Sequence, residues 1–385
     1  MAAHCFPITD RSRRIWHDSF SLAPSSELEL NGSANWSVKK QTLHGGVSEG
    51  VEVVELHNGR LALSILPTRG MGIWKGVCGN LELGWNSPVE WPVHPAFVNA
   101  LDRGGIGWLA GFNEWVCRCG LDQNGPPGPD GTLHGRIANL PAHTVEVRVE
   151  TAGEGTLAVT GVVDESMMFG PNLRLRSTVV TTAGSTRFTI IDEITNRRGT
   201  PADVQLLYHI NTGRPFLEAG GQCLAPTREV APRDPRAAEG IDDYDRYAPP
   251  AAGYAEQVYY YDLATDATFQ TVALLRNGAG DRGLSLHFDQ RELPCFSLWK
   301  NTQSEQEGYV TGLEPATNLP NQKAFERSQG RVIELPPGET YRVRLEIAVH
   351  GTAEEVQQVE AQIARLQGET PPRVHRAPRG GWSPA

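Results

Sequence analysis

The sequence predicts an all-β protein, built as a large antiparallel β-sandwich with one short helix near the C-terminus. Short segments rich in Val, Ile, Leu and Thr recur along the chain, and most alternate apolar with polar residues, as half-buried strands do. The 41 glycines and 27 prolines are scattered, which suits many strands joined by turns. Helical spacing of apolar residues is confined to one segment, close to the C-terminus.

The predicted strands fall into two groups along the chain. The first group comprises Val51–Leu56, Leu61–Leu66, Thr144–Glu150, Leu157–Val163, Leu173–Val180, Arg187–Ile191 and Val204–Ile210. The second group comprises Gln257–Asp262, Thr271–Arg276, Leu284–Phe288, Phe296–Lys300, Tyr309–Leu313, Arg331–Leu335 and Tyr341–His350. Turn-forming pairs such as Asn58-Gly59 and Pro337-Gly338 separate strands, as a sandwich requires.

The predicted helix is Ala353–Leu366, because apolar residues recur there at three- and four-residue spacing and Gly368 follows as a stop. The tail Glu369–Ala385 is rich in Pro, Arg and Gly and is expected to be extended or mobile. The turn-rich patch Ala225–Gly253 is expected to be a surface loop bordering a site. We therefore expect one sandwich domain over residues 1–350, with a β-rich lead-in over 1–50, and a helix and tail over 351–385.

Charge and composition exclude several classes of partner. The formal net charge is -10 and the basic residues are dispersed, so a phosphate backbone would be repelled and no nucleic acid is expected to bind. Apolar runs are strand length, far short of the roughly 20 residues that cross a bilayer. The N-terminus lacks the pattern of a signal peptide. We expect a cytoplasmic monomer or homodimer that does not associate with membranes.

The sequence also argues against a metal or cofactor. Cys117 and Cys119 are two residues apart, but no second Cys/His pair completes a four-ligand pattern, so both are expected to be core residues. Gly105-Ile106-Gly107 is not part of a βαβ unit, and no phosphate-binding loop or nucleophile elbow is present. Neither a metal site nor a cofactor site is predicted.

Three polar motifs place titratable groups where predicted strands meet loops, from which a rigid sheet can aim side chains into a cleft. They are Leu133-His134-Gly135-Arg136, then Leu207-Tyr208-His209-Ile210-Asn211, then Leu313-Glu314-Pro315-Ala316-Thr317-Asn318. Opening a sugar ring requires a carboxylate base and a histidine acid on opposite sides of one pyranose, and these motifs contain both.

The order His-Gly, Tyr-His-x-Asn, Leu-Glu-Pro-x-Thr-Asn resembles that of the aldose 1-epimerase (galactose mutarotase) superfamily. The segments 66–73, 119–125 and 133–136 resemble, more narrowly, an uncharacterised bacterial branch of it. The resemblance covers residues 50 to 350. It implies a galactose-mutarotase-like supersandwich and an isomerase that interconverts anomers of a free aldose or sugar derivative by acid–base ring opening, without metal or cofactor.

The resemblance also implies residue roles. Glu314 matches the catalytic base, His209 matches the acid that protonates the ring oxygen, and His134 matches a histidine that hydrogen-bonds the ring or anomeric oxygen. The expected substrate-binding residues are Arg136, Arg69, Asn211, Lys300 and Trp299. The Gly-Arg-Tyr-Ala-Asn-Arg run of better-known members is absent. Their substrate-gripping aspartate has only candidates here, namely Asp242, Asp243 and Asp245.

Two alternatives stay open. A lyase or glycoside-processing enzyme on the same scaffold would use a Tyr or Lys base, for which Tyr208 and Lys300 are available. A non-catalytic sugar-binding protein would keep the cleft but would have little need of an acid–base pair. For the epimerase, we expect Glu314, His209, His134 and Arg136 to line one open cleft on the concave face of the sandwich.

Overall fold

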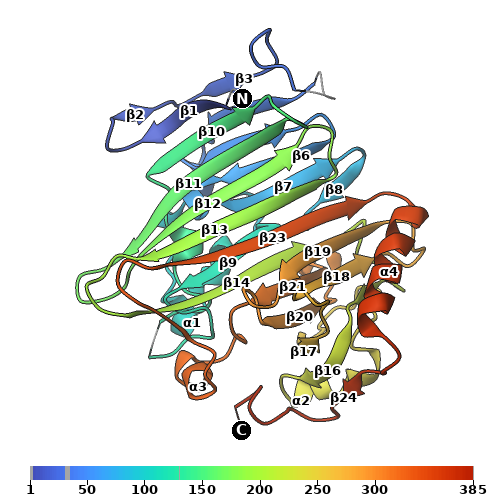
Figure 1. The fold of residues 1–385 in the computed structure, drawn as a ribbon. Helices are drawn as coiled ribbons and strands as arrows, with labels where there is room; N and C mark the ends of the chain where they lie inside the picture. The colour runs from blue at the N-terminus through green and yellow to red at the C-terminus, as the bar shows by residue number, and fades with distance from the viewer. Residues whose placement is uncertain (1–2, 31–34, 130, 385) are drawn as a thin grey trace.

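The computed structural model describes residues 3–30, 35–129 and 131–384, and within them two large, mainly antiparallel sheets pack against each other (Figure 1). One sheet has ten strands in the order β15-β18-β19-β23-β13-β12-β11-β10-β1-β2. The other has fourteen, in the order β24-β16-β17-β20-β21-β14-β9-β7-β6-β5-β4-β3, with β22 paired to β14 and β8 paired to β7. The predicted fold class is confirmed.

The strands of the ten-stranded sheet are β1 (Ala3–Asp10), β2 (Ile15–Trp16), β10 (Thr144–Glu150), β11 (Thr156–Ser166), β12 (Asn172–Thr182), β13 (Arg187–Asn196), β15 (Gln222–Leu224), β18 (Gln270–Arg276), β19 (Gly283–Asp289) and β23 (Thr340–His350). Those of the fourteen-stranded sheet are β3 (Phe20–Leu22), β4 (Ser37–Thr42), β5 (Glu52–His57), β6 (Leu61–Leu66), β7 (Gly72–Cys78), β8 (Leu81–Leu83), β9 (Val116–Leu121), β14 (Ala202–Thr212), β16 (Thr227–Pro232), β17 (Gln257–Leu263), β20 (Cys295–Asn301), β21 (Val310–Ala316), β22 (Ile333–Leu335) and β24 (Arg373–Val374).

The helices are short except for α4, and they lie at the margins of the sandwich (Figure 1). They are α1 (Asp102–Gly105), α2 (Pro235–Ala238), α3 (Lys323–Ser328) and α4 (Ala353–Gln367). The predicted helix is α4: the Thr352 side chain caps it by accepting from the Glu355 amide at 3.2 Å, and Gly368 ends it. Among the described residues, no helix is long and apolar enough to cross a membrane.

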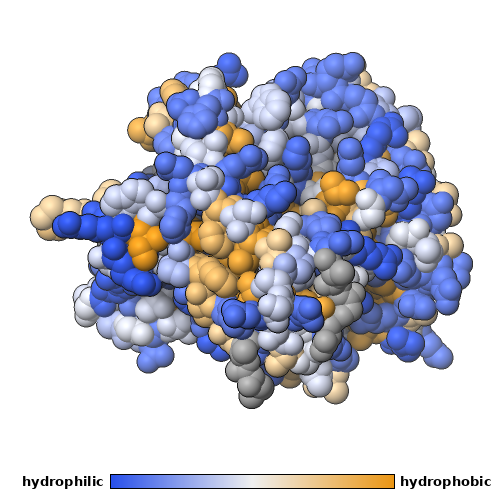
Figure 2. Space-filling view, turned by 90° about the horizontal axis from the view of Figure 1, so that it is seen from above, coloured by the Kyte–Doolittle hydropathy of each residue, from blue (hydrophilic) through white to orange (hydrophobic). Residues whose placement is uncertain are grey.

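The main core lies between the two sheets, where alternate residues of each strand meet. Leu206, Tyr208 and Ile210 of β14 belong to it, and so do Ile190 and Ile194 of β13. Seen from above, apolar side chains show mainly in a central band of the surface, with hydrophilic ones on both sides (Figure 2). Strands of the fourteen-stranded sheet are also covered on their other face, so β14 is buried along nearly its whole length.

Most strand predictions are confirmed, and two other expectations need correction. The patch Ala225–Gly253 contains β16 and α2 rather than loop alone. The tail after α4 includes an extended segment, as expected, but it is packed: β24 pairs in parallel with β16, and Ser383 is only 5% exposed. Composition alone misses these contacts because the tail's anchors, such as Trp382, are single residues within a polar run.

Candidate active site

A second cluster of buried residues covers the face of the fourteen-stranded sheet that points away from the ten-stranded sheet. It joins strand residues to side chains from the 3-10 turn Gly107–Gly111 and from the loops around it, and includes Trp108, Phe112, Cys117, Cys119, Leu207, Tyr260 and Ala316. Both cysteines are buried on β9, as predicted. The polar motifs of the sequence meet on this face.

Glu314 and His209 are directly paired here. They stand on the neighbouring antiparallel strands β21 and β14, whose register aligns Ile210 with Leu313 and so places His209 opposite Glu314. Glu314 Oε1 lies 3.1 Å from His209 Nε2. The residues are only 3% and 4% exposed, so a carboxyl and an imidazole share a site from which water is almost excluded.

The orientation of the His209 ring is fixed by Asn211. The amide nitrogen of Asn211 donates to the backbone carbonyls of Glu114 at 2.9 Å and His209 at 3.2 Å. Its carbonyl oxygen therefore faces His209 Nδ1 and accepts a hydrogen bond from it. Nδ1 carries a proton, and Nε2 is the atom that exchanges one with Glu314.

Burial moves the two groups in opposite directions. It raises the pKa of Glu314 well above its ordinary value, an effect strengthened by the Glu256 carboxylate and opposed by Arg233. Burial, with a smaller contribution from the His134 ring, lowers the pKa of His209 to about 3. Both shifts favour the uncharged forms, so the pair holds one proton on the Glu314–His209 contact in addition to that on Nδ1.

A glycine leaves room for this contact. Gly312 lies opposite Asn211 and two residues before Glu314, on the same face of β21. A Cβ at this position would lie 2.9 Å from Glu314 Oε1 and 3.0 Å from His209 Cε1. Any side chain here would therefore press on both the Glu314 carboxyl and the His209 ring, which explains a glycine in the middle of a buried strand.

His134 reaches the same place from the loop between β9 and β10. Its ring centre lies 5.5 Å from that of His209 and 4.8 Å from that of Trp108. His134 Nδ1 donates to the Asn124 carbonyl at 3.0 Å, so Nε2 is the accepting nitrogen of the neutral ring. Burial lowers the pKa of His134. The side chains of Asn124 and Asn318 exchange two hydrogen bonds of 3.0 and 2.9 Å, which tie the His134 loop to the residues following Glu314.

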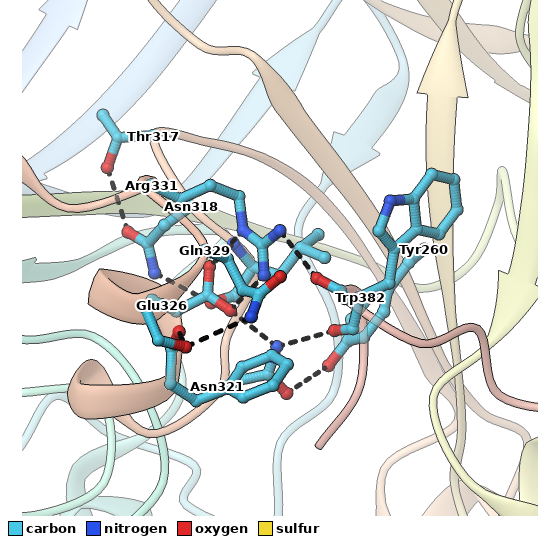
Figure 3. Close-up of polar contacts among 12 residues, drawn as sticks. Tyr260, Thr317, Asn318, Asn321, Glu326, Gln329, Arg331 and Trp382 are labelled. Atoms are coloured by element: carbon cyan, nitrogen blue, oxygen red, sulfur yellow. Dashed lines mark hydrogen bonds and ion pairs between the residues drawn. The ribbon is translucent and has the colours of Figure 1, made fainter. Parts of the chain in front are cut away.

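A polar network fixes the loop after β21 and the C-terminal tail together (Figure 3). Glu326 is fully buried and accepts from Arg331 at 2.6 and 2.7 Å and from Asn321 at 2.8 Å. Asn321 also donates to the Trp382 carbonyl at 2.8 Å, and its own carbonyl oxygen accepts from Tyr260 at 3.4 Å. The tail is therefore part of the frame that positions the strand carrying Glu314.

Two charged residues that the sequence analysis missed lie at the rim. Trp299 Nε1 donates to Glu256 at 2.5 Å, and Arg233 Nη2 donates to the same carboxylate at 3.0 Å. The Trp299 ring centre is 5.2 Å from that of His209. Arg233 follows β16 inside the turn-rich patch, and Glu256 precedes β17. The patch, which was expected to border a site, gave a signal for Arg233, whereas Glu256 lies just beyond it and had none.

Several predicted substrate-binding residues do not converge on the pair. Arg136 is exposed, and among the described residues its side chain makes no hydrogen bond or ion pair with the site. Arg69 is 1% exposed and its guanidinium binds Glu114 and the Gly111 carbonyl. Lys300 points away from the face that carries Trp299, and donates to the carbonyls of Asp243 and Arg246 at 2.7 and 2.6 Å.

The two candidate bases of the alternative lyase reaction, Tyr208 and Lys300, also lie away from the Glu314–His209 pair. Tyr208 faces the core between the sheets and donates to Asp192 at 2.7 Å. Lys300 is held as described above, and burial lowers its pKa to about 8. Asp242 lies on the surface in an ion pair with Arg376 at 2.6 Å, which leaves it no role beside Glu314 in this structure.

The expected open cleft is closed in this structure. The rings of Phe112 and Trp299 lie 5.1 and 5.2 Å from that of His209, and together with Trp108 they cover the acid–base pair. The sequence analysis expected Trp299 to bind substrate but did not single out Phe112 or Trp108. A sugar could reach Glu314 only after part of this cover moves, and Trp299, which is partly exposed, is its outermost ring.

Comparison with known proteins supports the family and the fold. Residues 48–349 match the family described as a domain of unknown function, DUF4432. A candidate aldose 1-epimerase from Klebsiella pneumoniae is 34% identical, with a TM-score of 0.94 over 98% of this chain and 99% of that one. The search of curated proteins finds no match.

More distant structures share the fold. A galactose mutarotase-like protein from Clostridium acetobutylicum is 14% identical, with a TM-score of 0.56 over 80% of this chain and 98% of that one. A galactose 1-epimerase from Lactobacillus acidophilus is 12% identical, with a TM-score of 0.53 over 81% of this chain and 98% of that one. At these identities the likeness concerns architecture alone.

Proposed function

The chain belongs to the DUF4432 family, within the aldose 1-epimerase-like superfamily, and from this membership we propose that it is a sugar 1-epimerase. It would interconvert the anomers of a free aldose or sugar derivative, with Glu314 as base and His209 as acid. The observation that supports this most is the buried contact of 3.1 Å between the two side chains. The sequence analysis expected the two groups on opposite sides of a ring, but the anomeric hydroxyl and the ring oxygen are bonded to the same carbon. A base and an acid in contact can therefore serve both oxygens from one side.

The proton balance of ring opening fits the pair. In the reactive state Glu314 is a carboxylate and His209 is protonated at Nε2. Glu314 takes the proton of the anomeric hydroxyl, the bond between the anomeric carbon and the ring oxygen breaks, and His209 protonates the ring oxygen. The pair is then neutral and the sugar is an open-chain aldehyde. Ring closure on the other face of the carbonyl, after a bond rotation, returns both protons and gives the other anomer.

The burial of Glu314 and His209 supports this order of proton transfers. The raised pKa of Glu314 and the lowered pKa of His209 both favour the neutral pair, which is the form present with the open-chain aldehyde. The protein therefore stabilises the proton arrangement of the least stable sugar form. Hydroxyl groups of a bound sugar would replace part of the lost hydration and make the charged arrangement accessible for the first step.

The surrounding residues would hold the ring. His134 Nε2 can accept a sugar hydroxyl, because its Nδ1 is occupied by the Asn124 carbonyl. Trp299 offers an indole face to sugar C–H groups, as aromatic residues do in carbohydrate sites. Arg233 and Glu256 at the rim can donate to and accept from hydroxyls, at the cost of their mutual contact of 3.0 Å.

Anomer exchange measured on the wild-type protein tests the proposal directly. One-dimensional NMR is followed over a panel of freshly dissolved aldoses, deoxy sugars and sugar acids, with the spontaneous rate subtracted. We expect accelerated α-to-β exchange for at least one of them and no new ultraviolet absorbance. An unsaturated product that absorbs in the ultraviolet would identify a lyase instead. Binding without faster exchange in any sugar would identify a binding protein.

A further inference from the structure

A groove of about 570 Å³ lies on the same sheet face as the acid–base pair, towards the N-terminal strands. Its floor follows β6, whose outward residues Ala62 and Ser64 are small. The walls are longer side chains from the adjoining strands, including Glu55 and His57 on one side and Lys75 on the other. Small residues between long ones make a trough in a sheet that would otherwise be flat.

The strand register aligns these side chains into two rows across the trough. Glu55 lies opposite Ser64, and Ser64 lies opposite Lys75. The second row runs from β4 to β8 through Ser37, His57, Ala62, Val77 and Glu82. Directly paired side chains stand within about 5.5 Å of each other, so each row presents donors and acceptors close together.

The polar groups of the trough are available to a ligand. Within the described residues, no hydrogen bond or ion pair is recorded for the side chains of Glu55, Ser64, Glu82 or Asn86. His57 Nδ1 donates to the Asn35 carbonyl at 2.8 Å, which leaves Nε2 as an acceptor. This is unlike Lys300 or Arg69, whose polar atoms are satisfied by the protein. Hydroxyl-rich molecules suit such a surface.

The charges of the trough oppose an anionic ligand. Glu55, Glu82, Lys75 and Arg214 line it, and the charge of Arg214 is already neutralised by Glu305 at 2.7 Å. No positive excess is present to attract a phosphate, a sulfate or a uronic acid. The half-buried Trp85 ring closes one end of the trough and offers an apolar face. Unpaired hydrogen-bonding groups, one indole and the absence of a positive excess match a neutral saccharide.

Trp85 also links the trough to the acid–base pair. Its Nε1 donates to the Glu114 carbonyl at 3.2 Å, the same carbonyl that Asn211 binds. Its ring centre lies 5.2 Å from that of Phe112, whose ring lies 5.1 Å from that of His209. In the sheet, β6 lies three strands from β14, or about 14 Å at the usual strand spacing. One sugar ring cannot span that distance, but a chain of several can.

We propose that this trough binds the non-reducing part of a neutral oligosaccharide whose reducing end reaches Glu314 and His209. This inference rests on the proposed epimerase function for the reducing end, but binding in the trough does not depend on turnover. The substrate class would then be short neutral oligosaccharides rather than monosaccharides, with Trp85 between the two parts of the ligand.

The test compares monosaccharides with tetrasaccharides. Glucose, galactose and xylose are compared with maltotetraose, cellotetraose and xylotetraose, in wild type and in Ser64→Trp, which fills the floor of the trough. Arg176→Trp places the same indole at an exposed position on β12 of the other sheet and serves as the control. Anomer exchange gives kcat/KM, and isothermal titration calorimetry gives binding without turnover.

We expect one tetrasaccharide to exceed its monosaccharide in kcat/KM at least tenfold in wild type and in Arg176→Trp, and this ratio to fall at least tenfold in Ser64→Trp. Binding of that tetrasaccharide should weaken in parallel. Equal ratios in all three proteins, or no tetrasaccharide that binds better than its monosaccharide, would overturn the inference. Tetrasaccharide binding that Ser64→Trp abolishes, without exchange of any sugar, would instead refute the epimerase function and leave the trough intact.

Discussion

A polar pair is buried on each face of the fourteen-stranded sheet beside β14, and the two pairs differ in how many partners they have. On the inner face, Arg118 binds both oxygens of Asp192 and the Ser177 hydroxyl, and Asp192 accepts from Tyr208 as well. On the outer face, Glu314 contacts His209, and no other partner of its carboxyl is recorded among the described residues. Both pairs are almost fully buried.

This difference teaches which buried pair can do chemistry. The Arg118–Asp192 pair keeps its charges because hydrogen bonds replace the lost water on every side. The Glu314–His209 pair lacks that support, so burial pushes both groups towards their neutral forms. A pair whose hydrogen-bonding groups are all satisfied holds the sheets together. A buried pair with few hydrogen-bond partners can instead exchange its proton with a substrate.

The largest effect is expected on activity from the outer pair. Glu314→Gln keeps the shape and loses the base, so anomer exchange should fall by a factor on the order of 10² to 10⁴. His209→Asn should act similarly, and the double variant should lose less than the product of the two factors. Exchange is measured by NMR, with Glu193→Gln on the other sheet as the control. Full activity in Glu314→Gln would remove Glu314 as the base.

The inner pair should respond in stability instead. Asp192→Asn leaves the Arg118 charge buried without a counter-ion, and breaking such a pair costs about 3–5 kcal/mol. Urea unfolding should show this loss, whereas Glu314→Gln should unfold within about 1 kcal/mol of wild type, because a neutral carboxyl is replaced by a neutral amide. Equal losses in the free energy of unfolding of the two variants would mean that the Glu314–His209 pair is charged like the Arg118–Asp192 pair.

A smaller effect is expected from the residue that orients His209. Asn211→Ala removes the acceptor of the Nδ1 proton, a contact worth about 1–3 kcal/mol when the ring is charged, so kcat should fall roughly 10- to 100-fold. The same contact raises the pKa of His209 in wild type. In the variant, the fall in kcat on the acidic side of the pH–rate profile should therefore occur at lower pH. A change in stability without a change in the pH profile would show a purely structural role.

The smallest effect, taken per pH unit, is the pH dependence of stability. His209 has a pKa of about 3 in the folded protein and an ordinary value of 6.5, so below 6.5 the unfolded chain binds a proton that the folded protein does not. Its contribution therefore lowers stability as the pH falls from about 6.5 towards 3, by up to about 1.4 kcal/mol per pH unit. Unfolding of His209→Asn should lack this part of the slope. Identical slopes in both proteins would mean that His209 is charged in the folded state.

The sequence could predict the strands and the meeting of Glu314, His209 and His134 because both depend on local patterns. Glu314, His209 and His134 stand in ordered motifs at strand ends, and the structure brings all three together. Lys300 was wrongly expected beside Trp299. On a strand, adjacent residues point to opposite faces, so the assignment of Trp299 to the cleft already excluded Lys300.

The rest of the site depends on contacts that no local pattern shows. Arg233 and Glu256 come from irregular segments flanking β16 and β17, and only the fold brings them to Trp299. Arg69 carries the charge expected of a ligand-binding residue, but the Gly111 carbonyl and Glu114 surround it. Whether a buried charge meets protein or ligand is decided by tertiary packing, which a single sequence does not display.

The position of β23 has a consequence for synthesis on the ribosome. This strand contains residues 340–350, yet it lies in the interior of its sheet between β13 and β19. Until it emerges, both neighbours expose unpaired edges, which are templates for pairing with other chains. In a nascent chain stopped before residue 340, the ten-stranded sheet would therefore remain in two unjoined parts. We expect such truncated products to need chaperones or to be degraded.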